Sequence, residues 1–351
     1  MRACRQIAKN RDRCLIHEGA SVVRDPRPVH AWSVMTRYLV LCVLLTAIAG
    51  AAVRGAESEL PQIAPDLVRV GLVNDGPPPS PTGATPDESN SCAQVSFSRN
   101  LKYGESDQNV LDVATGDSRD TSPRPVLLFV AGESFTDDSG AAPDAAMIED
   151  EAMCFAARHG MVGVKVNYRL APANPWPAGA RDVAAATSWV HQNIDLFGGS
   201  RDEIVAVGYV VGAFHVASFL GHPELQANDS SVAGAVLVSG IYRPGPDASA
   251  PERSYFGADA SKYDERSALP GILNVETPLL LAWSAADAPR LIAQGEKLKQ
   301  LLCNASAHCP HTTVLKERES LASLFAPDAS GGSLAEPTLE LIREIEARGM
   351  P

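Results

Sequence analysis

A strand-to-helix corner is encoded by residues 204–213, which read IVAVGYVVGA. The first four residues have the length and β-branched content of a buried strand, and a helical pattern follows at once. Gly208 and Gly212 flank the apex of the corner, where such a sharp turn needs small residues. The residue between them is Val210. The segment therefore predicts a tight corner that carries a hydrocarbon side chain at its apex.

Strands and helices alternate on both sides of this corner. The apolar runs predict further strands at 110–114, 126–130, 161–168, 232–239, 278–283 and 312–315. Helical spacing appears at 144–159, 180–197, 289–302 and 334–348, whereas 242–273 is loop-rich. This alternation predicts an α/β fold with a mostly parallel central sheet and helices on both faces. Ligand sites in such sheets lie beyond the carboxyl ends of the strands.

Three segments of different character make up the chain. Residues 1–56 are predicted to be an N-terminal extension with a signal peptide, residues 57–90 a flexible lead-in rich in Pro, Gly and Ser, and residues 91–351 the α/β domain. The uncharged stretch 38–53 follows Arg37 and ends in small residues, as secretory signals do. We therefore expect an exported protein, periplasmic or secreted. The alternative is a membrane anchor formed by uncleaved residues 38–53.

Charge and cysteine spacing limit the classes of partner and cofactor that this chain is expected to bind. Of the formal net charge of −12, residues 1–55 contribute +6 (nine Lys or Arg against three Asp or Glu), so the remainder carries −18. An acidic body repels nucleic acid and anionic lipid, so we expect no nucleic-acid partner and membrane contact only through the N-terminal segment. No CxxC spacing supports a metal site, and we expect no cofactor. The sequence indicates no particular oligomeric state.

Four cysteines follow the signal segment, an even number that suggests disulfides in an exported protein. Cys303 and Cys309 are close in sequence and are predicted to bridge a short loop. A bond between Cys92 and Cys154 is a weaker prediction, because Cys154 falls in a helical pattern and could be a buried free thiol.

Several motifs carry a family resemblance. Residues 129–135 read FVAGESF, 166–172 read VNYRLAP, 176–183 read WPAGARDV and 197–199 read FGG. With the corner at Val210, these stretches make residues 92–345 resemble bacterial carboxylesterases of the α/β-hydrolase fold, in the feruloyl-esterase-like and hormone-sensitive-lipase-like branch. The resemblance implies a Ser-His-Asp triad, with the serine at the apex of the corner and backbone N–H donors for an oxyanion.

The catalytic positions depart from that pattern. Val210 occupies the nucleophile position and Ser320 the histidine position, while Asp287 retains the acid. The resemblance places the oxyanion hole at Gly132, Glu133, Ser134 and Val211. The Glu133 carboxylate would oppose the negative charge that such a hole stabilises.

These departures predict a non-catalytic pseudo-hydrolase that binds a small ester or acid ligand, or a partner protein. The alternative is an active ester hydrolase with a displaced nucleophile. Its candidates are Ser134, Ser284, His215 and an acid/base pair of Glu133 with Asp287, whereas His308 and His311 lie at the wrong end of the last strand. The strained backbone of a nucleophile position serves to expose a hydroxyl group, which valine lacks. We therefore also expect the turn at Val210 to have relaxed, or Val210 and Val211 to pack against neighbours.

Overall fold

The computed structural model describes residues 92, 94–117, 122–132, 134–136, 145–226, 230–305, 309–315, 324–325 and 333–349. The chain divides into two units, Met1–Gln62 and Ile63–Pro351, and every described residue belongs to the second. The predicted signal segment 38–53 and the lead-in 57–90 lie outside the described residues. In the described part, none of the helices combines the length and the apolar character needed to span a membrane.

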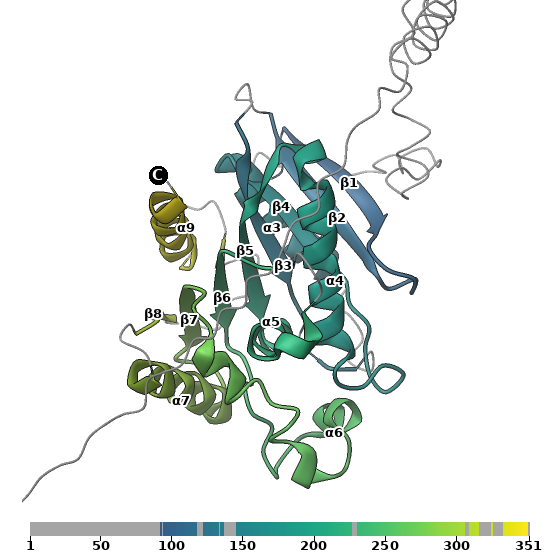
Figure 1. The fold of residues 1–351 in the computed structure, drawn as a ribbon, viewed down its shortest axis with the longest axis vertical. Coiled ribbons are helices and arrows are strands. Elements are labelled where there is room, and N and C mark those ends of the chain that lie inside the picture. The colour runs from purple at the N-terminus through teal and green to yellow at the C-terminus, as the bar shows by residue number, and fades with distance from the viewer. Residues whose placement is uncertain are drawn as a thin grey trace, which may run out of the picture. The chain divides into compact units, whose positions relative to one another are not determined.

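Eight strands form one sheet in the order β1-β2-β4-β3-β5-β6-β7-β8 (Figure 1). Their bounds are β1 Val95–Lys102, β2 Val110–Gly116, β3 Arg124–Val130, β4 Val162–Val166, β5 Gly199–Tyr209, β6 Gly234–Val238, β7 Leu279–Ser284 and β8 His311–Leu315. Strand β2 runs antiparallel to β1 and β4, and the pairs from β4 to β8 are parallel. The predicted mostly parallel α/β sheet is confirmed, and it has the α/β-hydrolase fold.

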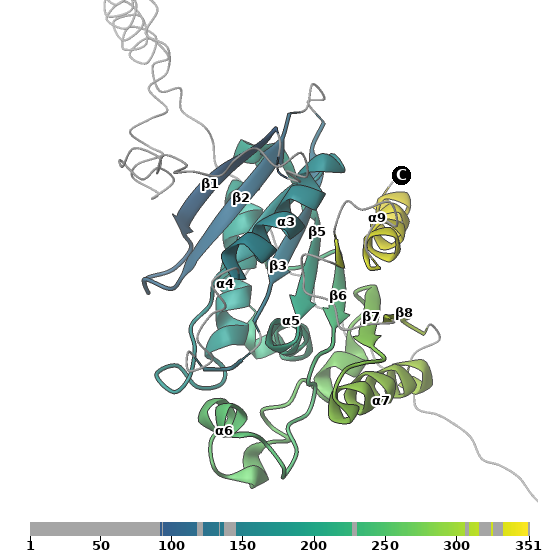
Figure 2. The same cartoon turned by 180° about the vertical axis from the view of Figure 1, so that it is seen from behind.

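Helices cover both faces of the sheet, with α3 (Ala145–Arg158) and α4 (Ala178–Asn193) on opposite sides (Figures 1 and 2). Helix α5 (Val211–Gly221) packs against α4 and β5, and α9 (Ala335–Gly349) contacts β5, β6 and β7. Strands β4, β6 and β7 are buried along their whole length. Burial on both faces explains why most of their residues are apolar.

The segment after β6 lies beyond the sheet, at the bottom of Figure 1. It was predicted as loop-rich, and it contains helix α6 (Ala250–Phe256) with two short 3₁₀ turns. The Ser249 side chain accepts from the Glu252 N–H, and the Glu252 carboxylate accepts from the Ser249 N–H, which caps α6 at its N-terminus. Glu252 also pairs with Arg290 of α7 (Pro289–Ala305), so the segment is tied to the main domain.

Two disulfides hold peripheral segments in place. Cys303 and Cys309 join the end of α7 to the start of β8, as predicted. Cys92 and Cys154 are also bonded and attach the chain before β1 to α3. The sequence ranked this second bond lower, because Cys154 falls in a helical pattern and could have been a buried free thiol. Two disulfides are typical of an oxidising compartment.

An ion pair explains why the YRLAP stretch and the Asp after WPAGAR occur together. The Asp182 carboxylate is buried on α4 and accepts from the Arg169 backbone N–H at 2.8 Å and from the Arg169 guanidinium at 2.7 Å. These bonds to Asp182 raise the pKa of the Arg169 guanidinium above its ordinary value. The loop that follows Arg169 then reaches the β3 loop, because the Ala171 N–H donates to the Phe135 carbonyl at 2.9 Å.

Candidate functional site at the β5–α5 corner

Val210 stands at the apex between β5 and α5 with φ 51° and ψ −106°. The expected relaxation of this turn is therefore wrong, because the valine keeps a left-handed conformation that is costly for a β-branched residue. Tertiary contacts impose it. The Val210 N–H donates to the Val238 carbonyl at 2.9 Å. A Cβ on Gly212 would stand 1.8 Å from the Val130 carbonyl oxygen, and one on Gly208 2.5 Å from the Ala213 Cα, so both glycines are sterically required.

The apex side chain is buried rather than presented to solvent. Val210 is 8% exposed and Val211 3%, and both belong to the main hydrophobic core. The second expectation for this turn, apolar packing of the two valines, is thus confirmed. An isopropyl group has no proton to lose and no lone pair, so it cannot attack an acyl carbon.

The backbone donor that follows the apex is already occupied. The Val211 N–H, predicted as an oxyanion donor, donates to the Gly132 carbonyl oxygen at 2.9 Å. A Cβ on Gly132 would lie 2.0 Å from the Tyr168 hydroxyl, so any larger residue at this position would have to displace the Tyr168 side chain. Ser134 lies nearby and its hydroxyl accepts from the Thr136 N–H at 3.2 Å. Glu133 lies outside the described residues.

Asp287 sits at the carboxyl end of β7 and is 7% exposed. Its Oδ2 accepts from the Ser239 hydroxyl at 2.6 Å and from the Ser284 N–H at 2.9 Å. Ser239 follows β6 directly and has a positive φ of 50°. The sequence reading missed Ser239, although its position at the end of a predicted parallel strand was a usable signal. Ser320, the predicted histidine position, lies outside the described residues.

His215 lies one turn into α5, within an aromatic cluster. Its ring centroid is 4.5 Å from that of Tyr168, 5.3 Å from Tyr255 and 5.8 Å from Phe135. Among the described residues its buried Nδ1 has no hydrogen-bond partner. Complete burial lowers the pKa of the His215 imidazole to about 3, so the ring is neutral at physiological pH. These contacts are those of a core residue.

The other displaced-nucleophile candidates have local structural roles. The Ser284 hydroxyl accepts from the Ala286 N–H at 3.0 Å. His311 begins β8 and its Nε2 lies 2.9 Å from Glu344 Oε2 on α9, at the opposite end of the strand from the corner. His308 lies outside the described residues. The structure thus brings five of these residues together at the carboxyl ends of the parallel strands: Val210, Val211, Gly132, Ser239 and Asp287.

Several known proteins that are similar to this chain are named esterases. Residues 80–245 match the model of the carboxylesterase family. Esterase LipC of Mycobacterium tuberculosis (strain ATCC 25618 / H37Rv) is 34% identical over 167 residues, which are 45% of this chain and 40% of that protein. Para-nitrobenzyl esterase of Bacillus subtilis (strain 168) is 31% identical over 110 residues, 28% of this chain and 22% of that protein. The chain therefore spans less than half the length of these relatives.

A solved structure extends the likeness over most of the chain. Esterase B from Lactobacillus rhamnosis, inhibited with a tributyrin phosphonate, superposes with a TM-score of 0.59 at 15% identity and covers 90% of this chain and 96% of its own. The described domain is thus an α/β hydrolase by fold. Its residues 80–245, a little under half of the chain, are similar to the carboxylesterase family.

Proposed function

We propose that this protein is a carboxylesterase-family scaffold that no longer hydrolyses esters by the serine mechanism and serves instead to bind a small ligand. One observation carries the proposal: the corner keeps the backbone geometry of a nucleophile elbow, with φ 51° at its apex, but carries Val210 there. Loss of a single triad member already costs several powers of ten in rate.

The neighbouring contacts support the same conclusion. An oxyanion hole stabilises developing charge only with N–H groups that point at it without a partner. The Val211 N–H is instead bonded to Gly132 within the protein. An acyl oxygen would have to displace that carbonyl before it could receive the donor. The corner therefore lacks both the attacking atom and a ready donor.

The alternative function, an esterase with a displaced nucleophile, has one pair of residues to favour it. Ser239 donates its hydroxyl directly to Asp287 at 2.6 Å. A carboxylate is a much weaker base than an imidazole, and triads place a histidine between the acid and the serine hydroxyl. We therefore assign the Ser239–Asp287 contact a structural role at the ends of β6 and β7.

Hydrolysis of p-nitrophenyl butyrate tests the proposal. We expect wild-type protein and a Val210→Ala variant to give the same low rate, because neither has a hydroxyl at the apex. A Ser239→Ala variant should also match the wild type. A wild-type rate typical of functional esterases that falls by about a hundredfold or more in the Ser239→Ala variant would establish a displaced nucleophile instead.

We also propose that the protein is exported to the periplasm or secreted. The two disulfides support an oxidising compartment, and the segment 38–53 has the composition of a secretory signal. Fractionation of cells that produce the full chain, followed by N-terminal sequencing of the recovered protein, tests both export and cleavage.

A further inference from the structure

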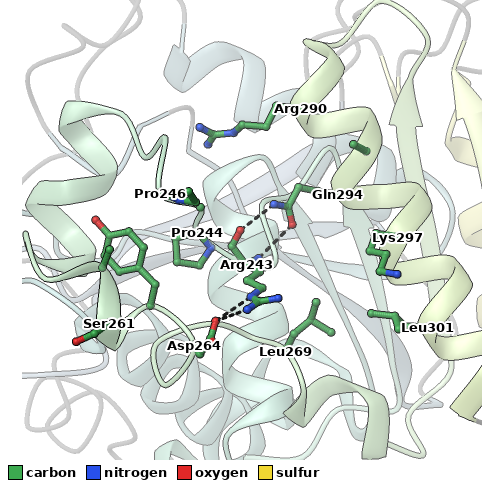
Figure 3. A pocket seen from close by; sticks show the side chains of 14 residues that line it. Arg243, Pro244, Pro246, Ser261, Asp264, Leu269, Arg290, Gln294, Lys297 and Leu301 are labelled. Atoms are coloured by element: carbon green, nitrogen blue, oxygen red, sulfur yellow. Dashed lines mark hydrogen bonds and ion pairs between the residues drawn. The ribbon is translucent and has the colours of Figure 1, made fainter.

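A cavity of about 660 Å³ lies between the segment after β6 and helix α7 (Figure 3). Its volume falls within the range of small-molecule sites, roughly 300–1,000 Å³. The chain segments that form the two walls follow the carboxyl ends of β6 and β7, where ligand sites of parallel sheets occur. Neither Val210 nor Asp287 lines the cavity, so it is distinct from the corner described above.

The lining is cationic although the protein as a whole is acidic. Arg243, Arg290 and Lys297 line the cavity against one acid, Asp264, in a chain with a net charge of −12. The rest of the wall is largely apolar and includes Pro244, Pro246, Tyr263, Leu269 and Leu301. Three cations beside an apolar wall fit a ligand that has a negative head and an apolar body.

The walls are held in position without a ligand. Gln294 of α7 accepts from the backbone N–H groups of Tyr242 and Arg243, each at 3.1 Å, and its amide donates to the Arg243 carbonyl at 2.8 Å. Figure 3 shows Gln294 and Arg243 side by side in the middle of the site. Arg290 is fixed separately by the almost fully buried Glu252 carboxylate. A preformed site loses less conformational entropy when it binds.

Two of the cationic side chains, Arg243 and Lys297, can bind an anionic ligand without breaking a strong ion pair. Arg243 pairs with Asp264 at 2.6 Å, but their side chains are 57% and 72% exposed, so the pair contributes little free energy and is easily opened. Lys297 bonds only the neutral Gln300 amide oxygen, at 3.3 Å, and forms no ion pair with any residue that the structure describes. Arg243 and Lys297 are therefore available to a ligand.

We propose that this cavity binds a small organic carboxylate, whose charged group meets Arg243 and Lys297 and whose apolar body packs against Pro244, Tyr263 and Leu269. The proposal rests on the binding role proposed above and names its site and ligand class. It does not depend on whether the corner has lost hydrolysis.

Calorimetric titration with octanoate and with neutral octanamide tests this site. We expect the wild type to bind octanoate about tenfold more tightly than octanamide. The Arg243→Gln and Lys297→Gln variants should each weaken octanoate binding about fivefold, the upper range for an exposed ion pair, and leave octanamide binding unchanged. Lys299→Gln is the matched control, since Lys299 is exposed on the same helix but does not line the cavity.

Different failures identify different errors. Equal affinity for octanoate and octanamide would overturn the carboxylate specificity. An equal loss of octanoate affinity in the Lys299→Gln variant would overturn the assignment to this cavity. Octanoate binding that neither the Arg243→Gln nor the Lys297→Gln variant weakens would also overturn it. In both cases the protein would still bind a small ligand, so the proposed binding role would stand. The rate of p-nitrophenyl butyrate hydrolysis is measured separately and bears only on the loss of catalysis.

Discussion

Acidification from about pH 7 to about pH 4 is expected to lower the free energy of unfolding of both the wild-type protein and a His215→Phe variant. The decrease should be about 3 kcal/mol larger in the wild type. The pKa of the buried His215 is lowered to about 3, against 6.5 for an exposed imidazole. Between these values the unfolded chain binds a proton that the folded protein rejects. The stability due to the neutral ring is therefore complete above about pH 6.5 and is lost as the pH falls towards 3.

Urea unfolding at a series of pH values provides the measurement. The decisive quantity is the slope of unfolding free energy against pH, so a uniform loss of packing in the variant does not affect it. His215→Leu serves as a second variant in case the larger phenylalanine ring fits poorly beside Gly179, where His215 is tightly packed. Parallel slopes for wild type and both variants would contradict the buried, neutral state of His215.

Asp182→Ala is expected to lower the free energy of unfolding by about 2 kcal/mol, because it removes the buried carboxylate of an ion pair whose Arg169 side chain is 30% exposed. The Asp182 side chain is only 4% exposed, and its loss leaves both the Arg169 guanidinium and the Arg169 backbone N–H without their acceptor. Since the Arg169 loop contacts Phe135 through Ala171, the variant should also loosen the loop that holds Gly132 against the corner.

Asp195→Ala is the matched control for this variant. Asp195 pairs with Arg201, but the two side chains are 55% and 50% exposed, so the loss should stay below about 1 kcal/mol. Thermal and urea unfolding of the two variants give the comparison. A similar small loss in both would show that the Arg169–Asp182 pair has no special role in the fold.

The core strands could be predicted from sequence because burial on both faces leaves a continuous apolar run. The strand β1 was missed, since it is an edge strand with a mixed burial pattern and several polar residues. Helix α6 was missed because it has only seven residues and lies in a segment rich in proline and glycine. Both omissions concern elements whose stability comes from tertiary contacts rather than from local pattern.

The β5–α5 corner shows how much of the candidate site could be predicted from the sequence. Its glycines and Val210 were readable from spacing, but the positive φ of Val210 contradicts local preference. The conformation follows from contacts with Val238 and Val130, which the sequence does not reveal. The bond from Val211 to Gly132 likewise depends on the path of a distant loop, and the Ser239–Asp287 contact joins the ends of two strands.

The most direct test of the central claim is the mass of the intact protein after exposure to an alkyl phosphonate ester, the class of inhibitor present in the esterase B structure. Such a reagent forms a covalent adduct with an activated serine. We predict that the wild-type mass stays unchanged, because a valine occupies the apex of the corner. Stoichiometric addition of one phosphonyl group, mapped by peptide analysis to a serine of this chain, would contradict the account.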